Sequence, residues 1–128
     1  MSIWNVFTDP STPDPFRDAT RALFERLPDT PSYRGSERTP FALDVATRTA
    51  ELRAAGFEPV HSEILRWDMI LDADRTCALY ATFSQVALLC DEERRRFLRG
   101  LRNVILEEFE GSVRRSFLTA FYRAQRPE

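Results

Sequence analysis

The order of its apolar segments constrains the fold of this chain more than any other feature. Ile3–Phe7 is a short apolar run with strand character, and residues 58–70 and 113–124 form two longer segments with alternating side chains. Segments of helical periodicity lie between these runs. Strands that alternate with helices along 128 residues predict a single α/β domain, residues 1–128, whose core needs no disulfide or structural metal.

Residues that typically start and stop helices mark the predicted helices. Asp14 followed by Pro15 supplies a side-chain cap and a proline at the first helical position. Asp91 caps the last helix, and Gly56 and Gly111 suit the position after a helix C-terminus. The predicted helices cover about 15–27, 41–55, 75–89 (in one or two pieces) and 91–110. The buried stripe of the last helix is predicted to comprise Phe97, Leu98, Leu101, Val104, Ile105 and Phe109.

The same patterns predict which segments are buried. Ile3–Phe7 is expected to be a buried strand, and 58–70 carries apolar side chains on both faces, which predicts partial burial on both. Cys77 and Cys90 lie among apolar residues and are expected to be buried free thiols. Residues 28–40 contain three prolines and one glycine, which predicts a flexible surface loop or a lid.

Charge and hydropathy narrow the possible partners. A net charge of −2 gives no reason to expect nucleic acid or an anionic membrane surface as a partner. The amino terminus lacks the basic-then-apolar pattern of a signal peptide, and no apolar run approaches membrane-spanning length. A cytoplasmic location is therefore expected by default.

Four short motifs, in order, resemble those of a known family. They are Trp4-Asn5-Val6, Ala55-Gly56-Phe57-Glu58-Pro59-Val60, Ala78-Leu79-Tyr80-Ala81-Thr82-Phe83-Ser84 and Thr119-Ala120-Phe121-Tyr122-Arg123-Ala124-Gln125-Arg126. Together they resemble the carboxy-terminal, substrate-side half of class I S-adenosylmethionine (SAM)-dependent small-molecule methyltransferases of the type 11-like group. The resemblance implies a truncated Rossmann-like half with about a three-stranded mixed sheet and four to five helices. It also implies parallel first and second strands, with the last strand antiparallel between them.

The resemblance does not extend to the family's cofactor site. That family holds SAM through a glycine-rich turn after its first strand and an acidic residue after its second, both upstream of the matching segments. The four glycines of this chain, at positions 35, 56, 100 and 111, are isolated from one another. No cofactor is therefore expected in the isolated chain, and SAM is expected only if a partner supplies the binding half. Methyl transfer by this chain alone is not expected.

The implied topology places a candidate substrate site at one rim of the sheet. Ligands of such sheets bind beyond the carboxyl ends of the parallel strands. The expected rim comprises Asn5, Thr8 and Asp9 from the first strand, Trp67 and Asp68 from the second, and Arg114 and Arg115 from the start of the last. Tyr80, Phe83 and Ser84 would roof this site, and Tyr33 and Arg34 would close it as a lid. Aromatic walls with a few polar groups suit a small, flat, apolar ligand.

Structural roles compete with these assignments. Trp67, Tyr80 and Phe83 are also suited to a core, and the two arginines to solvent exposure. The aspartates at 68, 72 and 74 resemble a metal-binding cluster, but a turn rich in aspartate is commoner and the sequence has no second histidine, so no metal is predicted. The single histidine lies near the start of its strand, away from the rim, and Ser84 has no base nearby in sequence.

Three functions remain open at this point. The chain could be a repurposed small-molecule-binding protein or a cofactor-independent biosynthetic protein, guiding a cyclisation or rearrangement by shape and water exclusion. It could instead be the substrate-binding subunit of a split methyltransferase, or a non-catalytic self-associating module. An unpaired edge at Ile3–Phe7 predicts a homodimer, or a complementary methyltransferase half, that pairs with this strand.

Overall fold

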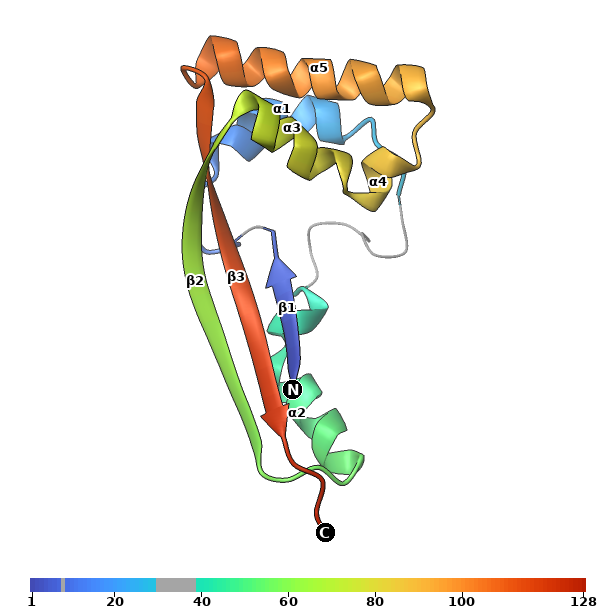
Figure 1. The fold of residues 1–128 in the computed structure, drawn as a ribbon, viewed down its shortest axis with the longest axis vertical. Helices are drawn as coiled ribbons and strands as arrows, with labels where there is room; N and C mark the ends of the chain where they lie inside the picture. The colour runs from blue at the N-terminus through green and yellow to red at the C-terminus, as the bar shows by residue number, and fades with distance from the viewer. Residues whose placement is uncertain (8, 30–38) are drawn as a thin grey trace. The chain divides into compact units, whose positions relative to one another are not determined.

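The fold was obtained as a computed structural model that describes residues 1–7, 9–29 and 39–128. Its contacts divide the chain into two compact units. Unit 1 contains residues 1–12, 37–68 and 116–128, and unit 2 contains residues 13–36 and 69–115. Each unit has its own packed elements, which Figure 1 labels.

Unit 1 is built on the sheet. Strand β1 (Ser2–Val6) pairs antiparallel with β3 (Ser112–Ala124), in a register that runs from Ser2 opposite Tyr122 to Val6 opposite Leu118. Strand β2 (Val60–Asp72) lies on the other side of β3, so the order is β1-β3-β2 (Figure 1). The predicted placement of the last strand between the first two is confirmed. The expected mixed sheet is corrected to an antiparallel one, because every strand neighbour is antiparallel.

Two short helices pack on one face of this sheet. The 3-10 helix η1 (Phe41–Leu43) and helix α2 (Val45–Ala54) replace the single helix predicted over 41–55. Asp44 separates them, because its side chain accepts a hydrogen bond from the Thr47 amide and so caps α2. The resulting small core gathers around Ala42, Ala120 and Tyr122, with Val6, Val45 and Leu52 packed against it.

Unit 2 is helical, and its boundaries follow the sequence closely. Asp14 caps α1 (Pro15–Phe24) by accepting from the Arg17 amide at 3.0 Å. The next helical segment is divided into α3 (Ala73–Ala81) and α4 (Ser84–Ala87), and α5 (Asp91–Glu108) follows, so the described residues contain five α-helices. The predicted stripe of α5 is confirmed: three of its residues are buried and the other three pack against the core. That core includes Phe16, Val86, Phe97, Leu101 and Ile105.

Three burial predictions were wrong. Strands β1 and β2 are largely exposed, because in the part of the chain that the structure describes they are the two edge strands of the sheet, each with β3 as its one strand neighbour. Of the two thiols, Cys77 is buried as expected, and its pKa is raised mainly by burial. Cys90 is exposed, because it occupies the N-cap position of α5 rather than a helix interior.

Candidate functional site

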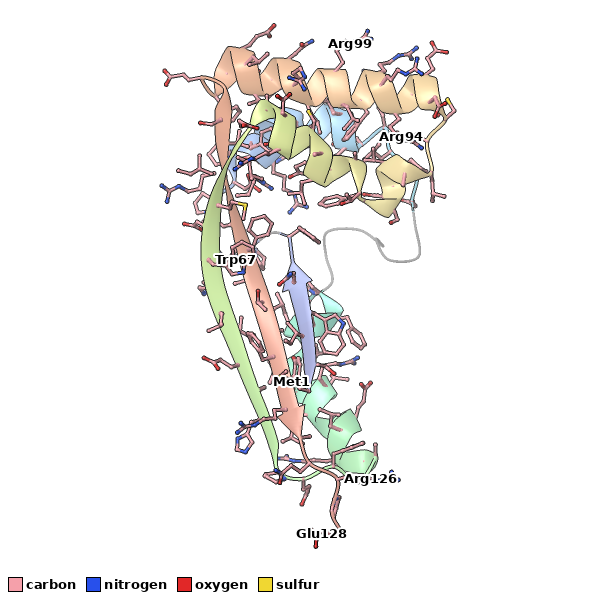
Figure 2. All side chains as sticks on the ribbon, viewed as in Figure 1. Met1, Trp67, Arg94, Arg99, Arg126 and Glu128 are labelled. Carbon is pink, nitrogen blue, oxygen red and sulfur yellow. The ribbon has the colours of Figure 1, made fainter. Side chains whose placement is uncertain are left out.

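An aromatic row crosses the sheet of unit 1. The indole of Trp67 on β2 stacks on Phe117 of β3, with ring centroids 4.5 Å apart and planes 24° apart. The ring of Phe7, directly after β1, forms a T-shaped pair with Phe117, with centroids 5.8 Å apart and planes at 78°. Phe117 is 4% exposed, whereas Trp67 and Phe7 are 37% and 43% exposed. These three side chains are here called the aromatic platform, in which Phe117 is buried and contacts the two exposed residues (Figure 2 labels Trp67).

The platform belongs to the face of the sheet that η1 and α2 do not cover. Side chains alternate along a strand, so Ile3, Asn5 and Phe7 share one face of β1, while Trp4 and Val6 share the other. Trp4 and Val6 face the covered side, since Trp4 packs edge-on against Phe41 and Val6 joins the small core. The other side, here called the open face, carries Ile3, Asn5, Phe7, Leu65, Trp67, Phe117, Thr119 and Phe121, and the same alternation places His61, Glu63 and Arg123 on it.

Part of the open face is apolar, although Glu63 and Arg123 also lie on it. Ile3 is 51% exposed and Leu65 is 43% exposed, in addition to the two exposed rings of the platform. Single exposed apolar side chains are ordinary, but a contiguous group is typical of a surface that binds something.

A directed chain of hydrogen bonds links the three strands beneath this face. Trp67 Nε1 donates to Thr119 Oγ1 at 2.8 Å, and Thr119 Oγ1 donates to Asn5 Oδ1 at 2.8 Å. The direction is fixed because an indole nitrogen can only donate, which leaves the single hydroxyl proton of Thr119 for Asn5. The amide NH2 of Asn5, an exposed residue, is therefore the donor at the end of the chain.

Asp9 does not act as a free carboxylate at this rim. The carboxylate is buried and accepts from the Ser11 hydroxyl at 2.6 Å, the Ser11 amide at 2.9 Å and the Thr12 hydroxyl at 3.0 Å, and it also pairs with Arg66. These bonds, led by that of the Ser11 hydroxyl, lower the pKa of Asp9 to about 2, although burial acts in the opposite direction. Asp9 holds the turn after β1 in place.

The predicted roof residues belong to the core of unit 2. Tyr80 is buried, and burial is the main cause of its raised pKa. Phe83 packs against the same core, and its ring lies 4.8 Å from that of Tyr80. Arg115 is also buried, and its guanidinium pairs with Asp14 at 2.6 Å and lies 5.1 Å from the Phe16 ring centre. These contacts explain Tyr80, Phe83 and Arg115 as structural residues of unit 2.

The predicted site residues thus fall into three groups. Asn5, Asp9, Trp67 and Asp68 lie in unit 1, and of these Asn5 and Trp67 are joined through Thr119. Tyr80, Phe83, Ser84, Arg114 and Arg115 lie in unit 2, where Ser84 is the exposed first residue of α4 and Arg114 is exposed on β3. Thr8, Tyr33 and Arg34 lie outside the described residues.

Phe7, Phe117 and Thr119 were not among the predicted site residues. The alternation of Phe117, Thr119 and Phe121 already placed these three on one face of the last strand. The pairing of that strand with the first would have added Phe7 and Asn5 opposite them. The sequence does not show directly which face of the sheet η1 and α2 cover.

The described glycines do not form a nucleotide-binding turn. Gly56 and Gly111 follow helices and have φ values of 85° and 92°, which suits helix C-termini. Gly100 lies inside α5, where an added Cβ would lie 2.9 Å from a terminal methyl carbon of Leu23. None of the three leads from a strand into a helix, as the glycines of a dinucleotide turn do. These positions do not fit SAM.

Comparison with known proteins does not assign the chain to a family. No protein-family model matches the chain, and no curated protein sequence matches it. Within residues 1–7, 9–29 and 39–128, no group of three or more histidine, cysteine, aspartate or glutamate residues could hold a metal ion. In the same ranges, no helix has the length and apolar character needed to cross a membrane.

Proposed function

We propose that this chain binds a small, flat, apolar ligand on the aromatic platform, as the substrate-side part of a methyltransferase-like protein. The observation that carries the proposal is the stack of Trp67 on Phe117, which holds a large ring in place with more than a third of its surface exposed. A fixed ring binds another ring at a low entropic cost, since it is already ordered before the ligand arrives.

The strand order supports the methyltransferase-like part of the proposal. The resemblance implies a last strand antiparallel between two strands that are parallel to each other, and β1-β3-β2 has that order. Fold likeness alone does not imply an activity, so the ligand-binding claim depends on the platform and not on the family. The chain would act by shape and by excluding water, without a cofactor of its own.

The expected affinity follows from the contacts. Two ring contacts contribute about 1 kcal/mol each, and covering on the order of 100 Å² of apolar surface adds roughly 2.5 kcal/mol. Their sum sets a limit on the order of 1 mM to the tightest dissociation constant expected, since immobilising the ligand opposes these contacts. Saturation-transfer difference NMR detects binding in this range.

The test uses two probes of similar size and different shape. Coumarin is flat, and 1-adamantanol is globular. We expect saturation transfer to coumarin and little to 1-adamantanol. Trp67→Leu should abolish the transfer to coumarin. Ile64→Ala should retain it, since Ile64 is an exposed apolar residue on the opposite face of the same strand. Equal signals from both probes, or unchanged coumarin binding in Trp67→Leu, would refute platform binding.

The exposed open face also favours a second candidate function. A contiguous apolar face can receive another polypeptide, which in a split methyltransferase would carry the SAM-binding half. In that case SAM binds only to the complex. Calorimetric titration of SAM into the pure chain and into a reconstituted complex distinguishes the two functions, since only the split enzyme gives heat with the complex.

A further inference from the structure

The two edges of the unit 1 sheet differ in how they are protected. Strand β2 is one edge, and its portion in unit 1 carries Glu63, Arg66 and Asp68, which discourage pairing with another strand. Strand β1 is the other edge, and its sequence Ser-Ile-Trp-Asn-Val contains no charge and no proline. Ile3 and Trp4 are 51% and 39% exposed there. The β1 sequence therefore lacks the charged side chains and prolines that often keep an edge strand unpaired.

Symmetric pairing of β1 with a second copy is restricted to few registers. In an antiparallel pair, directly opposite side chains lie on the same face of the sheet, so each residue must meet one of its own parity. The two-fold axis must then pass through a residue position. Centring on Asn5 pairs all five residues of the segment Ile3–Phe7, and centring on Trp4 pairs all five residues of β1 (Ser2–Val6).

The two registers differ sharply in side-chain matching. Centred on Trp4, the pairing places apolar Ile3 opposite polar Asn5 twice. Centred on Asn5, it places Ile3 opposite Phe7 on the open face and Trp4 opposite Val6 on the covered face, each twice. Apolar side chains then meet apolar ones throughout, and matched cross-strand pairs stabilise a sheet.

The hydrogen-bond chain favours the same centre. Thr119 donates to Asn5 Oδ1, so the Asn5 amide NH2 is the exposed donor at the end of the chain. Across a two-fold axis at Asn5, this NH2 meets the carboxamide oxygen of the second copy's Asn5, which retains an unused lone pair. A polar pair at a symmetry axis is a known way to fix register.

We propose that two copies of this chain pair antiparallel through β1, in the register centred on Asn5, to form a continuous six-stranded sheet. The pairing continues the sheet in its own plane, so it leaves the Trp67 ring on the open face accessible, although Phe7 of the platform then lies beside Ile3 of the second copy. The proposal does not require ligand binding.

The test measures the mass of the full chain in solution, first for the wild type and then for variants that carry a charge at position 5. Light scattering should give twice the chain mass of 14.9 kDa at tens of micromolar. Asn5→Lys and Asn5→Asp should each raise the dimer dissociation constant by at least about tenfold, because like charges then face each other at the axis. Mixing the two variants should restore a dimer. Glu63→Lys, on the protected edge, should leave the mass unchanged.

A second measurement covers the case in which charged variants fail to fold. In a Cys90→Ser background, which removes the exposed thiol, Asn5→Cys should form an intermolecular disulfide under mild oxidation. Ile3→Cys should not, because the two copies of position 3 lie far from the axis. A wild-type monomer at every concentration, a dimer unaffected by charge at position 5, or no recovery on mixing would overturn the proposal.

Discussion

The indole nitrogen of Trp67 donates a hydrogen bond to the hydroxyl of Thr119 at 2.8 Å, and this bond orders one side of the aromatic platform. The Trp67 ring is fixed twice, by this bond at its edge and by stacking on Phe117. The Thr119 hydroxyl in turn donates a hydrogen bond to Asn5, so this one hydroxyl connects all three strands.

Replacing Thr119 with valine tests this bond. The two side chains have nearly the same shape, but valine leaves the Trp67 donor and the Asn5 acceptor to water. We expect a loss of about 1 kcal/mol in the free energy of unfolding, measured by urea denaturation. Thr49→Val on α2, whose hydroxyl makes no such bond, is the matched control and should change stability by less. An equal effect of both substitutions would contradict the role given to Thr119.

Arg115 and Asp14 form an ion pair inside unit 2, and its removal should destabilise the fold. Asp14→Asn keeps a side chain suited to capping α1 but leaves the Arg115 charge without its partner, which should cost about 3 kcal/mol of unfolding free energy. Asp44→Asn changes the cap of α2 in the same way and should be nearly neutral. The experiment compares thermal or urea unfolding of the two variants. A nearly neutral Asp14→Asn would contradict the prediction.

Arg94 holds the end of α4 through its planar guanidinium. It donates to the Ala87 carbonyl at 2.7 Å, to the Leu89 carbonyl at 3.0 Å and to the Val86 carbonyl at 3.3 Å. Lysine cannot reach three carbonyls in this arrangement, so Arg94→Lys should destabilise the chain by about 1–2 kcal/mol. Arg99→Lys, at an exposed position of the same helix, should be neutral (both are labelled in Figure 2).

The lowered pKa of Asp9 predicts that the stability of the fold depends on pH. Its folded pKa, about 2, lies below the ordinary value of 3.8, so its stabilising effect is complete above about pH 4 and declines as the pH falls toward 2. The destabilisation caused by Asp9→Asn should therefore be larger at pH 7 than at pH 2.5. Urea denaturation of both proteins at the two pH values measures the difference. A constant difference would show that the carboxylate charge does not matter.

Local signals in the sequence predicted most of the fold. Asp14 and Pro15 fixed the start of α1, Gly56 fixed the end of α2, and the apolar spacing in α5 identified its buried stripe. Motif order predicted the central position of the last strand. These features depend on neighbouring residues, which a sequence displays directly.

The exposure of β2 and the composition of the site could not be predicted in this way. Leu65 and Trp67 have the apolar character of a buried strand, and periodicity does not reveal that both are exposed. Asp9 was expected at a ligand rim, whereas Ser11 and Thr12 fold back onto its carboxylate. Which side chains meet depends on strand pairing and helix placement, which are long-range properties.

The most direct test of the central claim is a ¹H–¹⁵N NMR titration that follows the two indole N–H signals of the chain during addition of coumarin. Trp67 lies on the open face, and Trp4 lies on the face that η1 and α2 cover, so each signal reports one side of the sheet. Trp4→Phe and Trp67→Phe assign the signals. We predict a saturable shift of the Trp67 signal with little change at Trp4. A shift at Trp4 alone, equal shifts at both, or no shift at Trp67 would contradict binding on the aromatic platform.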